Sequence, residues 1–320
     1  MSGNQETLVD SHLPHLSINP EKQPTILLIH GAFDTKNTWD PIHPYLSEYH
    51  FLIPTLPGHD DSSTSPVIGE LTLQTTSERL YQLVTAKAHN GQTHVVGHSF
   101  GANIALHFIS HYTDQILSVF VSGTAGFYPS SMTPYGLWID GILSYAMPRR
   151  LVEYLIDVDP RLWETSSFGN FRSLELCKAI SNILMIPVED EVLIPAVAQE
   201  ELKKRQVRAI AVAATKKGVL PTNDNVERAK AVAQRLGGIA AEVPTMRHAF
   251  VIQDPELFAR IVAAWIEGEV LPEGMHPSVK LILSGVSSWG VLRNQRNTYS
   301  PESWWHLRQP DHLFLDGFCW

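Results

Sequence analysis

Cysteine is almost missing from this chain of 320 residues, which contains only Cys177 and Cys319. Two cysteines cannot form the disulfide framework of a small secreted domain, and their spacing offers no Cys-x-x-Cys pair for zinc or redox chemistry. One bridge between them is open in principle, but two reduced thiols in a reducing compartment fit this usage better. We therefore expect a cytoplasmic protein.

Positive charge is also scarce, because 24 Lys and Arg residues stand against 33 Asp and Glu residues and give a net charge of −9. Nucleic-acid-binding proteins carry a basic excess or a basic stripe, and this sequence has neither. The same deficit disfavours binding to an anionic membrane surface. We expect neither nucleic acid nor a membrane as a partner.

Long apolar runs are absent too, since none approaches the roughly 18 residues that span a bilayer. Residues 1–24 lack the basic and apolar regions of a secretory signal. Glycine and proline, with 20 and 21 residues, are too few for a collagen-like or low-complexity chain. Because 44% of the residues are hydrophobic, the chain can bury a substantial core and is expected to be soluble and globular.

Short apolar runs alternate with helix-like segments along much of the chain. We expect strands at 25–30, 51–55, 93–99, 116–123, 207–215 and 239–243. We expect helices near 38–47 and 71–88, directly after Ser99, before Gly237 and after Asp254. This order predicts an α/β fold with a mostly parallel, doubly wound sheet, which binds ligands at the carboxyl ends of its strands.

The alternation stops between Ala125 and Gln206, where amphipathic helical patterns appear without a clear strand. This segment is interpreted as a helical insertion, and Pro- and Trp-containing residues follow Gly268 with little periodicity. The predicted division is a core at 24–124 and 207–268, a helical cap at 125–206, an N-terminal arm at 1–23 and a C-terminal extension at 269–320.

A Gly-x-Ser-x-Gly motif, Gly97 to Gly101, lies between a predicted strand and a predicted helix. The two glycines permit a tight turn that presents Ser99 at the positive end of the helix, where anionic intermediates are favoured. The motif is common by chance, and a serine at such a turn can be purely structural. Its place in the chain predicts that Ser99 is a nucleophile.

Two further motifs supply what such a nucleophile needs. His30-Gly31-Ala32 ends the first buried strand, and we assign the two oxyanion donors to the backbone N–H groups of Ala32 and Phe100, with Phe33 lining the pocket. Gly31 could also serve only a β–turn–α connection. His248 precedes the last predicted helix and is the expected base, although it is one of fifteen histidines.

These motifs resemble those of α/β-hydrolases of the esterase, lactonase and C–C hydrolase type. The resemblance covers about residues 24–268 and rests on ILLIHGAF, LIPTLPGHD, THVVGHSFGANIAL and MRHAFVIQDPELFARIVAAWI. It implies an α/β-hydrolase fold with a helical cap, Ser99 as nucleophile, His248 as base, and oxyanion donors at Ala32 and Phe100. It implies no cofactor.

The acid of the expected Ser-His-acid group departs from the family pattern. Lys217 occupies its usual place, four residues before a proline, and the alternative place reads Ser122-Gly123-Thr124. The nearest carboxylate is Asp224, which we predict to be the acid. The alternative is that Asp224 caps the following helix, a role that Asn223 or Asn225 could also perform.

The segment 125–206 is rich in aromatic residues, and Trp138 is predicted to line a largely apolar substrate pocket. His107 and His111 lie one helical turn apart but lack a companion glutamate, so we predict no metal site.

Three functions are compatible with these residues. The first is a serine hydrolase that cleaves an ester, lactone or thioester of a small apolar substrate held between core and cap. The second, suggested by the displaced acid, is a non-hydrolytic lyase, cyclase or condensation enzyme of secondary metabolism. The third is a ligand-binding protein on a hydrolase scaffold. The intact serine turn, oxyanion loop and His248 favour the first.

Overall fold

The computed structural model describes residues 12–32, 34–59, 71–124, 130–148, 150–151, 154, 173–217 and 223–277. An eight-stranded sheet in the order β1-β3-β2-β4-β5-β6-β7-β8 forms its centre. The strands are β1 (His15–Ile18), β2 (Thr25–Ile29), β3 (His50–Pro54), β4 (Thr93–His98), β5 (Ile116–Ser122), β6 (Arg208–Ala214), β7 (Ile239–Val243) and β8 (His276–Pro277). Strands β2 to β7 are parallel, whereas β1 and β8 pair antiparallel at the two edges. The predicted mostly parallel α/β sheet is confirmed.

The helices are α1 (Leu73–Lys87), α2 (Phe100–His111), α3 (Thr133–Ala146), α5 (Leu174–Leu184), α6 (Ala196–Lys204), α7 (Val226–Leu236), α8 (Phe250–Gln253) and α9 (Pro255–Glu267). Short 3₁₀ helices are η1 (Lys36–Trp39), η2 (His43–Leu46), η4 (His89–Gly91) and η5 (Thr113–Gln115). The helical stretch expected near 38–47 consists of two short 3₁₀ helices, η1 and η2, instead of one continuous helix. Pro41 lies between them and cannot donate the hydrogen bond that would continue a helix. Within the described ranges, every helix is too short or too polar to cross a bilayer.

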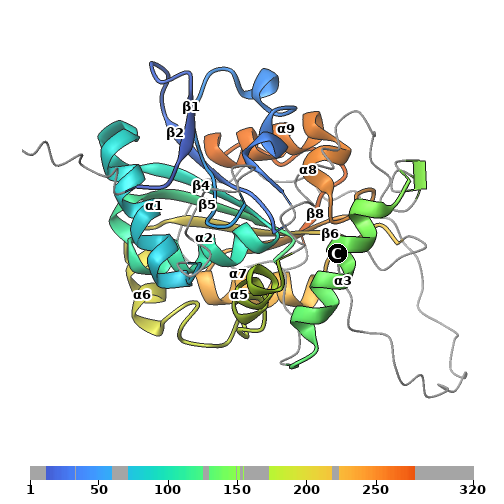
Figure 1. The fold of residues 1–320 in the computed structure, drawn as a ribbon. Coiled ribbons are helices and arrows are strands. Elements are labelled where there is room, and N and C mark those ends of the chain that lie inside the picture. Colours follow the sequence, from blue (N-terminus) through green and yellow to red (C-terminus); the bar gives the residue numbers. More distant parts are fainter. Residues whose placement is uncertain are drawn as a thin grey trace, which may run out of the picture.

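Helices cover both faces of the sheet, with α8 and α9 on one side and α1, α2 and α7 on the other (Figure 1). Successive strand residues therefore enter different cores. Leu27 and Ile29 of β2 pack toward α1, α2 and α7, whereas Ile26 and Leu28 pack toward η1, η2, α8 and α9. Burial on both faces explains why the parallel strands are apolar at nearly every position.

Helix ends match their sequence signals. Asp254 caps α9 by accepting a hydrogen bond from the Leu257 N–H, with Pro255 at the first helical position. Gly237 and Gly268 end α7 and α9 in the left-handed conformation that glycine adopts most easily.

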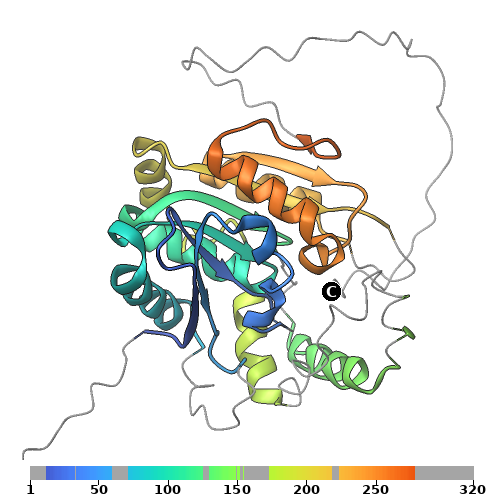
Figure 2. The same ribbon diagram turned by 90° about the horizontal axis from the view of Figure 1, so that it is seen from above.

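The described part of 125–206 contains helices and turns but no strand, and Figure 2 shows α3 beside α5 at the edge of the molecule. Helix α6 contacts α2 and α7 and so packs with the helices that cover the sheet. The predicted domain boundaries remain predictions. Strand β8 pairs with β7 inside the segment expected to be an extension, and a strand of two residues is too short to show an alternating pattern.

Candidate active site

Ser99 lies at the turn between β4 and α2, with φ 55° and ψ −124°, a conformation that few non-glycine residues adopt. A methyl group at Gly97 would lie 2.8 Å from the Ala105 Cβ, and one at Gly101 would overlap the carbonyl oxygens of Ile29 and His30. Both positions therefore require glycine, and the tight turn follows from the sequence.

His248 and Asp224 complete a continuous chain of hydrogen bonds from Ser99. The Nε2 atom of His248 lies 2.8 Å from Ser99 Oγ, and its Nδ1 atom lies 2.5 Å from Asp224 Oδ1. The side chain of His248 is 16% exposed and that of Asp224 is 4% exposed. The three residues predicted for nucleophile, base and acid are thus in contact with one another.

Asp224 is held in place by the end of β6. Its backbone N–H donates to the Ala214 carbonyl at 2.8 Å, and its Oδ2 accepts from the Ala214 N–H at 2.7 Å. The cap of α7 is the neighbouring Asn225, whose side chain accepts a hydrogen bond from the Arg228 N–H. Asp224 is therefore not the helix cap, and its Oδ1 faces His248.

The loops that carry Asp224 and His248 are joined by backbone hydrogen bonds. Thr215 N–H donates to the Val243 carbonyl at 3.1 Å, and Lys216 N–H donates to the Met246 carbonyl at 2.8 Å. These bonds extend the pairing of β6 with β7 beyond the sheet. They hold the two loops side by side, so that a carboxylate ten residues after β6 reaches the imidazole.

The surroundings of His248 favour its protonated form. Burial lowers the pKa of His248, but the Asp224 carboxylate, through its charge and its hydrogen bond, and the charge of Asp34 outweigh burial and raise this pKa above 6.5. His98, whose ring centroid lies 5.0 Å away, has its pKa lowered well below 6.5 by burial and by His248. A proton taken up at this site therefore resides on His248.

Gly123 lies against the side chains of His248 and Asp224 and leaves no room for a larger residue. A methyl group there would lie 2.8 Å from His248 Cε1 and 3.2 Å from Asp224 Oδ1, and φ is +61°. We expect Gly123→Ala to lower kcat about a hundredfold or more, because misplacing a catalytic group by about 1 Å costs that much. Gly91→Ala is the matched control, since Gly91 has φ +64° with no atom within 4 Å of its methyl group. Equal kcat in both variants would contradict this account.

The loop after β2, which carries the expected oxyanion donor Ala32, is fixed by His30. The His30 Nδ1–H donates to the Gly31 carbonyl at 2.9 Å, and Nε2 accepts from the Leu56 N–H at 3.2 Å. This arrangement needs a neutral ring, and burial, together with His59, lowers the pKa of His30 to about 3. A methyl group at Gly31 would lie 3.2 Å from Ser99 Cβ, so the loop passes close to the serine.

The other residues predicted for the site are Phe100, Phe33 and Trp138. Phe100 is the first residue of α2, where the N–H has no partner within the helix. Phe33 lies outside the described residues. Trp138 of α3 is partly buried and packs against the core that contains α1, α2 and α5.

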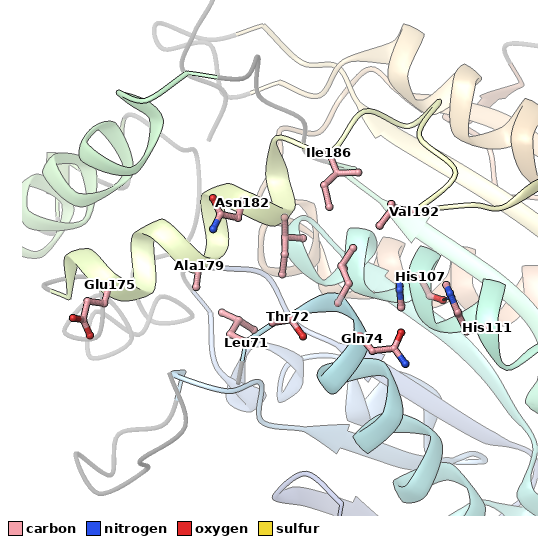
Figure 3. Close-up of a pocket in the computed structure, with 12 residues that line it drawn as sticks. Leu71, Thr72, Gln74, His107, His111, Glu175, Ala179, Asn182, Ile186 and Val192 are labelled. Carbon is pink, nitrogen blue, oxygen red and sulfur yellow. Dashed lines mark hydrogen bonds between the residues drawn. The ribbon is translucent and has the colours of Figure 1, made fainter. Parts of the chain in front are cut away.

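A pocket of about 750 Å³ lies elsewhere, between the start of α1, helix α2 and helix α5 (Figure 3). His107 and His111 line it with rings stacked 3.9 Å apart, and Ser77 Oγ lies 2.8 Å from His107 Nδ1. Ser99, His248 and Asp224 are not among the residues that line this pocket. In the part of the chain that the structure describes, no group of three or more His, Cys, Asp or Glu could hold a metal ion.

Sequence reasoning missed two residues at the site. Gly123 appeared only as a position without a carboxylate, although it makes room for the imidazole. Asp34 lies in the loop after β2 and interacts through its charge with His248, but no spacing rule connects it with the serine turn.

Comparison with known proteins places this geometry in a family. Residues 24–165 match a family described as alpha/beta hydrolase fold. An AB hydrolase superfamily protein from Gibberella zeae is 30% identical over 276 residues, which are 83% of this chain and 88% of that protein. Lipase 3 from Moraxella sp. (strain TA144) is 34% identical over 107 residues, 33% of this chain and 34% of the lipase. An esterase structure from Exiguobacterium antarcticum superposes with a TM-score of 0.61 at 15% identity, covering 79% of this chain and 94% of the esterase. The chain therefore belongs to the α/β-hydrolase superfamily.

Proposed function

We propose that the protein is a serine hydrolase that cleaves a carboxylic ester, lactone or thioester of a small, largely apolar substrate. The observation that carries the proposal is the hydrogen-bonded chain from Ser99 through His248 to Asp224. Similarity to a lipase over a third of the chain supports ester chemistry and an apolar acyl group.

In the proposed acylation step, Ser99 Oγ attacks the substrate carbonyl carbon while its proton passes to Nε2 of His248. Asp224 stabilises the resulting imidazolium through Nδ1–H, and the N–H groups of Ala32 and Phe100 donate to the oxyanion. The C–O or C–S bond then breaks, and the leaving group takes the proton from His248. The acyl group remains on Ser99.

In the proposed deacylation step, a water molecule attacks the acyl-serine carbonyl and gives one proton to His248. Collapse of the second oxyanion releases the carboxylic acid and returns that proton to Ser99 Oγ. The net reaction consumes one water molecule, whose oxygen enters the acid. The non-hydrolytic and binding-only alternatives depend on His248 having no carboxylate partner. The Asp224 carboxylate lies next to His248, which weakens the argument for both alternatives.

A rapid-mixing experiment with p-nitrophenyl butyrate tests the proposal. We expect a burst of about one p-nitrophenolate per protein when deacylation is slower than acylation, and one ¹⁸O atom from labelled water in each butyrate. Turnover without ¹⁸O in the acid would favour the non-hydrolytic alternative. Binding of esters without any release of p-nitrophenolate would favour the binding protein.

A further inference from the structure

Asp34 is a half-buried acidic group that the proposed mechanism does not use. Its Oδ2 accepts a hydrogen bond from the Gly31 N–H at 3.3 Å, and its own N–H donates to the Gly31 carbonyl at 3.4 Å. The Thr38 side chain also hydrogen-bonds the carboxyl group. The side chain therefore folds back over the loop that carries Ala32 instead of pointing into solvent.

This loop brings the carboxyl group close to the nucleophile. A methyl group at Gly31 would lie 2.7 Å from Asp34 Oδ2 and 3.2 Å from Ser99 Cβ, so these two atoms are no more than about 6 Å apart. Burial raises the pKa of the Asp34 carboxyl group above its usual range, although the Thr38 hydrogen bond, the charge of His248 and the Gly31 N–H oppose this shift. When it is ionised, Asp34 in turn raises the pKa of His248 through its charge. A second carboxyl group thus lies on the oxyanion-loop side of the serine, in addition to Asp224.

We propose, on the basis of the proposed function, that Asp34 is a positioning residue whose negative charge stabilises the His248 imidazolium and excludes substrates with an anionic acyl group. Substrates are then esters whose acyl group is neutral or cationic. A charge held near Ser99 Cβ, within about 6 Å of Asp34 Oδ2, would change an equilibrium by about a hundredfold at an effective dielectric constant near 20.

The His248 ring interacts with other titratable groups besides Asp34. In the described ranges, the titratable groups that interact with His248 are Asp224 from the loop after β6, Asp34 from the loop after β2, and His98 from the end of β4. His98 is neutral near pH 7, because burial and His248 lower its pKa. Asp224 is unchanged in the variants below, so any shift in His248 reports the loss of the Asp34 charge.

Asp34→Asn tests the proposal, because the amide can keep the hydrogen bond from Gly31 without the charge. We expect the acid limb of the kcat/KM profile to move to lower pH by about one pH unit, since His248 must be neutral to accept the Ser99 proton and loses one source of stabilisation for its cation. We also expect kcat/KM for the p-nitrophenyl monoester of glutaric acid to rise about tenfold or more relative to p-nitrophenyl pentanoate. These two esters differ in one terminal carboxylate.

Asp40→Asn is the matched control, since Asp40 is on the same segment with a side chain 59% exposed and lies 3.9 Å from His43. It should change neither the pH of the acid limb nor the ratio of kcat/KM between the two esters. Asp34→Glu keeps the charge, so the acid limb and this ratio should stay close to those of the wild type. Asp34→Ser provides a second neutral variant if Asp34→Asn does not fold. The proposal would be overturned if a neutral variant changed kcat/KM for both esters by the same factor and left the acid limb of the kcat/KM profile at the same pH.

An NMR titration of the His248 ring separates failure of this inference from failure of the proposed function, because it needs no turnover. A lower pKa of His248 in Asp34→Asn supports the charge effect even if no ester is cleaved. An unchanged pKa overturns the charge effect even if the protein is an active esterase.

Discussion

Ser99→Ala is expected to lower kcat for p-nitrophenyl esters by about 10⁴-fold to 10⁶-fold while the protein remains folded. The variant removes the only atom that can form the proposed acyl intermediate, but alanine keeps the Cβ and needs no new space in the turn. The glycines that shape the turn are untouched. Steady-state turnover and the thermal unfolding midpoint measure the two effects separately.

Ser122→Ala is the control for this result. Ser122 is buried at the end of β5, its backbone carbonyl accepts the Ser99 N–H at 2.9 Å, and its Oγ has no hydrogen-bond partner in the described part of the chain. Loss of that hydroxyl should leave kcat within about twofold, because no interaction of the side chain is removed. Retained turnover in Ser99→Ala would show that another group attacks the substrate.

Asp224→Asn is expected to lower kcat by about 10⁴-fold, the effect of removing the acid from a serine hydrolase. The Ala214 N–H requires an acceptor, so it orients the amide oxygen toward itself and leaves the amide NH₂ facing His248. That NH₂ group donates to Nδ1 and forces the imidazole proton onto Nε2. An Nε2–H cannot accept the proton of Ser99, and the nucleophile is not activated.

Asn225→Ala separates this effect from helix capping. Asn225 caps α7 through the Arg228 N–H, and its loss should reduce the free energy of unfolding by about 1 kcal/mol with little change in kcat. Asp224→Asn should show the opposite pattern, with a large loss of kcat and a small change in stability. Denaturant unfolding and turnover of both variants give the comparison. Near-normal kcat in Asp224→Asn would contradict the assignment of the acid.

The fold could be predicted from the sequence because its strands are buried on both faces and therefore appear as apolar runs. Strands β2 and β4 to β7 fall within expected segments, and β3 begins one residue before its expected segment. The turn at Ser99 could also be predicted, since Gly97 and Gly101 have no room for a side chain. Local signals of this kind depend on a few neighbouring residues.

The surroundings of His248 could be predicted only in part, because they depend on contacts between distant loops. Asp224 could be named as the nearest carboxylate, but its choice over Asn225 as the helix cap depends on the bonds to Ala214. Gly123 and Asp34 belong to other loops, and only the folded sheet brings them to the imidazole.

Covalent labelling with a fluorophosphonate tests the central claim most directly, because the reagent reacts with a serine that an adjacent base activates. Intact mass and peptide mapping of the wild-type protein should show one phosphonyl group, on the peptide that contains Ser99. Labelling should be absent in Ser99→Ala and much slower in Asp224→Asn. An unlabelled wild-type protein, or a label on a different residue, would contradict the assignment of Ser99, His248 and Asp224 as a catalytic group.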